Sequence, residues 1–237
     1  MTRRDTAALR ALAHRAGELA HRADVSRETF TAAAPWWQIR AQDTDRAQLY
    51  IYGVIGSDWD PDDVTAGGFT RALAEITSPA IDLHINSRGG SVWDGVAIYS
   101  ALLDHPATVD VSIDGVAASA ASFVAMAGDT IGVQKPASVM IHDAWALAIG
   151  NAQVMRDTAD VLDQLSDQMA GIYADRAGGT VASWRTSMRA ETWYTAAAAV
   201  EAGLADEVLN DTTKPVDADN RADTLIRARA RVALGKG

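Results

Sequence analysis

The chain of 237 residues contains no cysteine. This excludes disulfides, thiolate metal sites and a cysteine nucleophile. No run of 18 apolar residues is present, and the N-terminus is too charged for the apolar core of a secretion signal, so we expect a soluble protein without such a signal. The glycine spacings of a P-loop and of a dinucleotide-binding fingerprint are also absent.

Basic residues are scarce in the middle of the chain. Residues 41–209 hold eight Lys and Arg against 23 Asp and Glu, whereas residues 1–40 and 210–237 carry net charges of +3 and +2. An acidic body repels phosphates, so no nucleic-acid partner is expected. The basic ends fit two interpretations, solvated charge on mobile termini or segments that pack on an acidic surface, and we favour the first.

Hydrophobic periodicity divides the chain into three parts. Residues 1–40 contain an amphipathic helix followed by a linker, residues 41–209 form the main domain, and residues 210–237 form a polar, basic tail. In the main domain, alternating runs are followed by helical patterns, which predicts βαβ units and a mainly parallel sheet. The expected strands are 49–55, 81–86, 108–114, 130–133 and 138–141, and the expected helices are 62–76, 91–104, 119–127 and 151–176.

Two connections between a strand and a helix carry residues suited to chemistry. Gly89 and Gly90 follow the second expected strand and would expose backbone N–H groups, although a simple tight turn has the same sequence. Ser119 follows the third expected strand at the start of a small-residue helix, and Ser122 lies one turn deeper, where we expect it to be packed. Because parallel strands end at the same edge of a sheet, the pattern suggests a serine nucleophile beside an oxyanion hole.

A serine nucleophile needs a base, and the chain has five histidines. His142 directly follows a short apolar strand at the relevant edge of the sheet, whereas His84 lies inside an alternating strand and His105 precedes a proline. His14 and His21 belong to the expected N-terminal helix. A lone histidine after a strand often has a structural role, but together with Ser119 it predicts a catalytic pair.

Four segments, in this order, resemble ClpP-type serine peptidases and, within that group, the ClpP-related head maturation (prohead) proteases of tailed phages: NSRGGSVWDGVAIYSAL, GVAASAASFVAMAGD, SVMIH and TAAAAVEAGLAD. The resemblance covers residues 49–209 and implies a crotonase-like ββα superhelix with a long flanking helix. It also implies Ser119 as the nucleophile, His142 as the general base and Glu191 as the third member of a triad.

The same resemblance implies that the backbone N–H groups of Gly90 and Ala120 form the oxyanion hole. The chain departs from the family pattern at three places. Arg88 stands where proline is common, Glu191 stands where ClpP has aspartate, and the base is followed by Asp143 and an alanine instead of glutamine and proline. Asp143 is a competing candidate for the triad acid, but strand alternation directs it to the face opposite its neighbour.

The resemblance therefore implies a serine endopeptidase without cofactor or metal. Its substrates would be scaffold and capsid proteins, and its own tails, in a prohead assembling in the cytoplasm of a bacterial host. A homo-oligomeric ring is expected to form through the helix at 151–176, whose apolar stripe is centred on Leu165. The alternatives are a housekeeping ClpP subunit with a partner ATPase, a catalytically vestigial capsid-assembly protein, and a crotonase acting on acyl-CoA.

Overall fold

The computed structural model describes residues 45–56 and 64–210, so the expected N-terminal helix and the tail after residue 210 lie outside the described range. The strands are β1 (Arg46–Ile55), β2 (Ala80–Gly90), β3 (Thr108–Ala118), β4 (Thr130–Gln134), β5 (Ser138–Ile141), β6 (Thr192–Thr195) and β7 (Glu207–Leu209). The helices are α2 (Ala66–Ala74), α3 (Val92–Asp104), α4 (Ala120–Ala125), α5 (Ala152–Ala177), α6 (Val181–Arg189) and α7 (Ala196–Glu201). The α/β class is confirmed.

The seven strands form one sheet in the order β1-β2-β3-β4-β7, and β5 pairs with both β3 and β6. Every pairing is parallel except that of β5 with β6. β3 pairs with β4 along its first half and with β5 along its last residues, where Ala118 lies opposite Met140. The fork in β3 places the chain that follows it, including Ser119, beside the end of β5.

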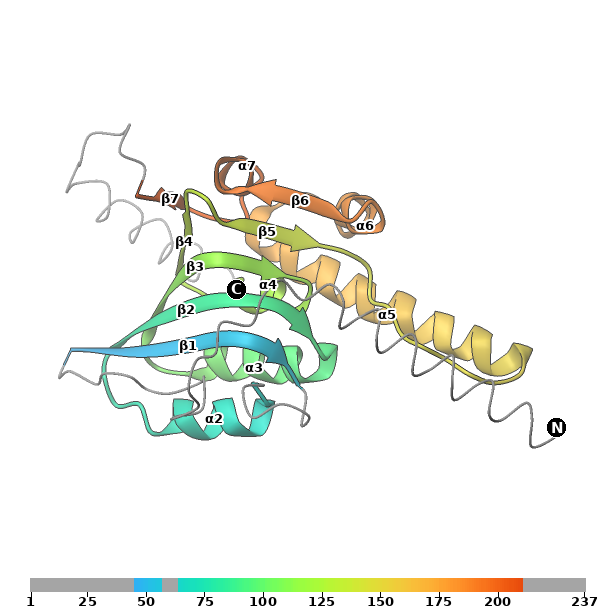
Figure 1. The fold of residues 1–237 in the computed structure, drawn as a ribbon, viewed down its shortest axis with the longest axis horizontal. Coiled ribbons are helices and arrows are strands. Elements are labelled where there is room, and N and C mark those ends of the chain that lie inside the picture. Colours follow the sequence, from blue (N-terminus) through green and yellow to red (C-terminus); the bar gives the residue numbers. More distant parts are fainter. Residues whose placement is uncertain (1–44, 57–63, 211–237) are drawn as a thin grey trace, which may run out of the picture. The chain divides into compact units, whose positions relative to one another are not determined.

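Helices α2, α3 and α4 lie together on one face of the sheet, and α5 extends beyond it (Figure 1). All six residues of α4 are buried. Side chains that pack in this layer have little space, because a Cβ on Gly95 of α3 would lie 2.7 Å from the ring of Phe123. The small residues around Ser119 therefore allow α4 to fit between α3 and the sheet.

None of the described helices has the length and apolarity needed to cross a membrane.

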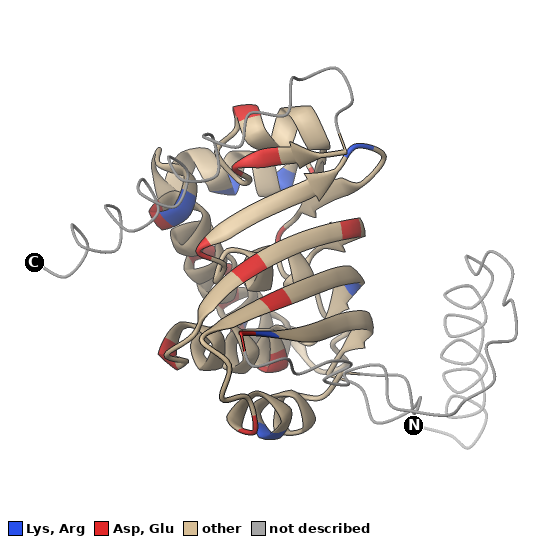
Figure 2. Ribbon diagram, turned by 90° about the vertical axis from the view of Figure 1, so that its left-hand side faces the viewer, with Lys and Arg blue, Asp and Glu red and all other residues tan. Residues whose placement is uncertain are grey.

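The opposite face of the sheet carries polar side chains, as the alternation in the sequence predicts, and Figure 2 shows acidic residues on neighbouring strands. Asp114 accepts hydrogen bonds from Tyr52 at 2.6 Å and from Ser112 at 2.7 Å, and it lies 2.8 Å from Nδ1 of His84. The hydrogen bond to Asp114 raises the pKa of His84 above its ordinary value, although desolvation opposes this shift. His84 is thus a structural histidine in the sheet.

We expect this pair to contribute more stability at acidic than at alkaline pH. A histidine with a raised folded-state pKa stabilises the fold fully below its unfolded pKa, and the contribution is lost as the pH rises through the folded value. Denaturant unfolding at about pH 5.5 and pH 8.5 should show that His84→Gln is more destabilising at the lower pH. His105→Gln is the control, because the His105 side chain has no ion pair among the described residues and accepts a hydrogen bond from the backbone N–H of Ala107. Equal losses at both pH values would contradict the expectation.

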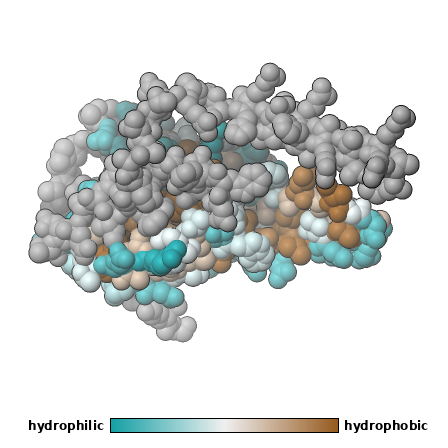
Figure 3. Space-filling model, turned by 60° about the horizontal axis from the view of Figure 1, so that its bottom comes forward, coloured by the Kyte–Doolittle hydropathy of each residue, from teal (hydrophilic) through white to brown (hydrophobic). Residues whose placement is uncertain are grey.

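The apolar stripe of α5 divides into two parts. Leu165 and Met169 are 7% and 5% exposed and pack within the same domain, so the expectation that Leu165 lies at the centre of an assembly surface is wrong. Three apolar residues of the first half of α5 are exposed instead, and Figure 3 shows apolar side chains gathered toward the protruding end of the molecule. The exposed apolar strip comprises Trp145, Leu147 and Ile149 before α5, and Val154, Met155 and Val161 on it.

Candidate active site

Ser119 occupies the turn between β3 and α4 with φ 54° and ψ −124°. A positive φ is strained for a residue with a side chain and persists where the surrounding contacts enforce it. The Ser119 N–H donates to the carbonyl of Met140 at 3.0 Å, and the Ser119 carbonyl accepts from Oγ of Ser122 at 2.6 Å. Ser122 is fully buried, as expected, and its Oγ lies 2.7 Å from the hydroxyl of buried Tyr173 on α5. The backbone of Ser119 is therefore held from two sides.

His142 is the first residue after β5, and its Nε2 lies 2.7 Å from Oγ of Ser119. The other two described histidines are elsewhere, since His84 pairs with Asp114 in the sheet and His105 caps the end of α3. A neutral imidazole at this distance can accept the hydroxyl proton of the serine. The structure thus brings together the serine and the histidine that the sequence selects.

The glycine-rich loop at the end of β2 lies against the same turn. A Cβ on Gly89 would lie 2.7 Å from the backbone N of Ala120 and 2.8 Å from Cβ of Ser119. Gly89 and Gly90 have φ values of 91° and 148°, so a side chain would be strained at either position. The Gly89 N–H donates to Oγ of Ser87 at 3.1 Å. This segment can approach the serine so closely only because position 89 is a glycine.

Glu191 directly precedes β6, and His142 directly follows β5, while the last antiparallel pair between these two strands joins Ile141 to Thr192. Its backbone has φ 48°, its side chain is exposed, and Oε1 lies 3.4 Å from Nε1 of Trp193. Within the described residues, no acidic side chain lies within hydrogen-bonding distance of His142. The register brings Glu191 close to the histidine, but its orienting role stays a prediction.

Asp143, the competing acid, is held by α6. Its Oδ2 lies 3.1 Å from Nη2 of Arg185 and 3.9 Å from Nε of Arg189. Sequence reasoning did not identify Arg185, which is buried beside Trp184 in α6. The available signal was an arginine placed among the apolar positions of an amphipathic helix.

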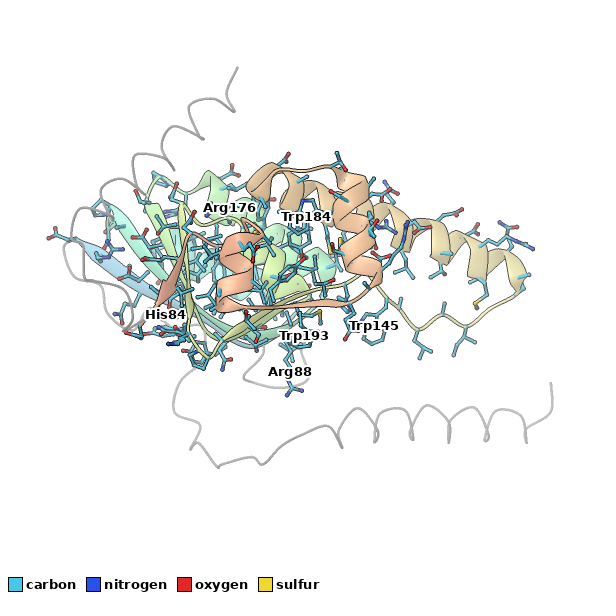
Figure 4. The ribbon with its side chains drawn as sticks, turned by 90° about the horizontal axis from the view of Figure 1, so that it is seen from above. His84, Arg88, Trp145, Arg176, Trp184 and Trp193 are labelled. Atoms are coloured by element: carbon cyan, nitrogen blue, oxygen red, sulfur yellow. The ribbon has the colours of Figure 1, made fainter. Side chains whose placement is uncertain are left out.

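Three side chains from segments next to the site are labelled in Figure 4. Arg88 projects from the glycine loop, Trp145 follows the histidine segment and Trp193 lies in β6, all on the lower side of the view in Figure 4. The two tryptophans are 76% and 56% exposed. Among residues 45–56 and 64–210, no group of three His, Asp or Glu side chains is arranged to hold a metal ion. At this edge of the sheet, the structure brings together a hydroxyl, an imidazole and backbone amides.

A serine hydroxyl held against an imidazole defines the serine hydrolases, in which the histidine removes the proton as the oxygen attacks a carbonyl. Comparisons with known proteins give the family. The pattern that describes Clp proteases matches residues 69–212, more than half of the chain. The chain belongs to the Clp protease family, and it is a serine endopeptidase of the ClpP type.

Individual relatives agree with this assignment. The ATP-dependent Clp protease proteolytic subunit of Bacteroides fragilis is 34% identical over 155 residues, which are 62% of this chain and 74% of the relative. The subunit of the same name from Chlorella vulgaris is 33% identical over 142 residues, covering 59% and 70%. Proteolytic subunit 2 of Corynebacterium efficiens is 32% identical over 146 residues, covering 60% and 73%. The resemblance to ClpP is confirmed, and the narrower resemblance to phage head maturation proteases stays a prediction.

Proposed function

We propose that Ser119 is the nucleophile of this peptidase and His142 its general base. The contact of 2.7 Å between Oγ and Nε2 carries this proposal. Nε2 takes the hydroxyl proton while Oγ bonds to the scissile carbonyl carbon, and the same proton then passes to the leaving amine. Water, deprotonated by His142, attacks the acyl-enzyme and releases the second product, after which Ser119 regains its proton.

The negative oxygen of each tetrahedral intermediate needs donors that are already in place. We assign this role to the backbone N–H groups of Gly90 and Ala120. The close approach of Gly89 to the backbone N of Ala120 supports the assignment, and the Gly89 N–H is already used, since it donates to Oγ of Ser87. Glu191 would accept the Nδ1 hydrogen of His142 and thereby fix the tautomer that presents a lone pair to Ser119.

A fluorophosphonate probe tests this chemistry, because it labels only an activated serine. We expect one label per chain, located by mass spectrometry on the peptide that contains Ser119. Absence of labelling would favour the alternative of a vestigial capsid-assembly protein.

We further propose that the substrates are scaffold and capsid proteins of a phage prohead, together with the tails of the protease itself. The order of the four motifs and the basic segments outside the peptidase domain support this role. The principal alternative is a housekeeping subunit with a partner ATPase, since the relatives are named as subunits of an ATP-dependent protease. Cleavage of capsid and scaffold proteins without ATP would support the proposal. Cleavage of folded substrates only with an added Clp ATPase and ATP would contradict it.

We also propose that the chain forms a homo-oligomeric ring, and that the exposed apolar strip, residues 145–149 together with Val154, Met155 and Val161, is an assembly surface. Its six apolar side chains are between 39% and 78% exposed, and exposed apolar patches often mark sites of protein–protein interaction. The segment that carries the first three runs beside α5 in Figure 1. Burial of this strip between copies would therefore stabilise an oligomer.

Val161→Asp is expected to lower the oligomer mass measured by light scattering. Val161 is 48% exposed in one copy, so a charge there costs the isolated chain little, whereas it would be buried in the assembly. Gln164→Asp, at an exposed polar position of the same helix, is the matched control. An oligomer mass unchanged by Val161→Asp would place the assembly surface elsewhere.

A further inference from the structure

His142 stands where the chain leaves the sheet. The last strand pairing before it joins Ile141 to Thr192, and residues 142–151 form neither helix nor strand. Strand hydrogen bonds therefore hold the backbone only on the N-terminal side of His142. On the other side, its position depends on how Asp143 and Ala144 are attached to the rest of the molecule.

Both residues are attached to the helices behind them. The Ala144 N–H donates to Oγ of Ser166 on α5 at 2.9 Å, and Ser166 in turn donates to the carbonyl of Leu162. Asp143 accepts from Arg185 of α6 at 3.1 Å. Because Ser166 contacts a backbone amide, only the second attachment depends on the side chain of a residue next to His142.

Arg185 is itself firmly held. It is 4% exposed, and its Nη1 donates to the carbonyl of Asp163 at 2.9 Å and to the carboxylate of Asp167 at 2.6 Å. Its Nη2 donates to the carboxylates of both Asp163, at 2.9 Å, and Asp143. The guanidinium thus joins α6, α5 and the segment that carries the base, in a geometry that its planar fork makes rigid.

Stability alone gives a weak reason for this arrangement. Arg185 Nε and Asp143 Oδ1 are both buried without a hydrogen-bond partner, and a buried ion pair with unmade bonds gains little over apolar packing. Asp163 and Asp167 are 73% and 62% exposed, so their pairs with Arg185 are screened by water. Desolvation opposes the charge on Arg185, but the hydrogen bond to Asp163 and the neighbouring carboxylates raise the pKa of the guanidinium.

We propose that Arg185 is a positioning residue for the peptidase reaction. By holding the carboxylate of Asp143, it fixes the backbone of His142 at the place from which Nε2 meets Oγ of Ser119. The inference rests on the proposed function, since Arg185 acts on the reaction only through His142. This role also explains why Asp143, the acid next to His142 in the chain, points toward Arg185 on α6 and not toward the histidine.

The test compares Arg185→Met, Asp143→Ala and the double variant, with a small p-nitrophenyl ester as substrate. Misplacing a reacting group by about 1 Å costs on the order of 10²-fold in rate, so each single variant should lose up to that factor in kcat with little change in KM. The double variant should be no slower than the slower single variant, because both changes break the same link. Arg185→Lys should recover part of the loss. Arg189→Met is the control, since Arg189 faces the same carboxylate at 3.9 Å but is 64% exposed.

A wild-type kcat in Asp143→Ala would overturn the proposal. So would a loss of kcat in Arg185→Met that is fully explained by unfolding, as shown by a lowered melting temperature. If Arg185→Met does not fold, Asp143→Ala decides alone, because it lies in an irregular segment and removes no apolar core. Fluorophosphonate labelling separates this inference from the proposed function. If the wild type is not labelled, both the proposed function and the positioning role are wrong. If the wild type is labelled and the variants keep its kcat, only the positioning role is wrong.

Discussion

Replacement of Ser119 by alanine is expected to abolish peptide cleavage while the fold and the assembly persist. The Oγ atom forms the acyl bond, and loss of the nucleophile of a triad costs on the order of 10⁴–10⁶-fold in rate. Ser122 cannot replace it, because its Oγ is fully buried and bonded to the Ser119 carbonyl and to Tyr173. Alanine meets the same backbone strain at φ 54° as serine does, so the melting temperature should change little.

Ser122→Ala is the matched control for this experiment. It leaves the Ser119–His142 contact intact but removes the partner of a buried tyrosine hydroxyl, so it should lower stability and keep fluorophosphonate labelling. Intact masses of the wild type and Ser119→Ala, purified in the same way, would also reveal self-processing of the tails. Activity that survives Ser119→Ala but is lost with Ser122→Ala would show that the nucleophile is misassigned.

The fold could be predicted from the sequence because its strands alternate so regularly. Ile81, Leu83 and Ile85 of β2 face the core with polar residues between them, and the same period recurs in β3. Glycines and caps mark the ends of the helices, as at Gly178 after α5. These signals are local, so they give the elements and their parallel order without any knowledge of tertiary contacts.

The candidate site could be predicted only in part. The positions of some of its residues follow from strand ends alone, whereas others depend on how the strands pair. Ser119, Gly89 and Gly90 lie at strand ends, and a parallel sheet brings such ends together. The place of His142 depends on β3 pairing with two different strands, a fork that no local pattern shows. The resemblance to a known family, and not periodicity, supplied the role of Glu191.

Two features required the three-dimensional structure. Leu165 and Val161 are equally apolar members of one stripe, and only the packing of α5 shows that the first is buried and the second exposed. Arg185 contacts residues 18, 22 and 42 positions away in the chain. Its place among the apolar positions of α6 indicates burial, but no local pattern identifies these partners.

Glu191→Gln is expected to keep the fold but to lower kcat by up to about 10⁴-fold, the loss known when the acid of a triad is neutralised and the histidine tautomer changes. Glu191 is exposed, and its weak contact of 3.4 Å with Trp193 leaves the side chain free to turn toward His142, which follows Ile141, the partner of Thr192. Contacts in a triad are often loose without substrate and tighten in the complex. The extra methylene of glutamate, relative to aspartate, lengthens its reach from the strained turn at φ 48°.

Asp143→Asn is the matched comparison for this prediction. Asparagine keeps an oxygen that can accept from Arg185, so the backbone of His142 should stay in place and kcat should fall far less than in Glu191→Gln. The measurement is kcat for ester hydrolysis by both variants, with melting temperatures recorded for each. If turnover survived Glu191→Gln but fell by several orders of magnitude with Asp143→Asn, the triad would be Ser119, His142 and Asp143. Oδ1 of Asp143, which has no hydrogen-bond partner among the described residues, would then have to accept from Nδ1 of His142, while Oδ2 stays bonded to Arg185.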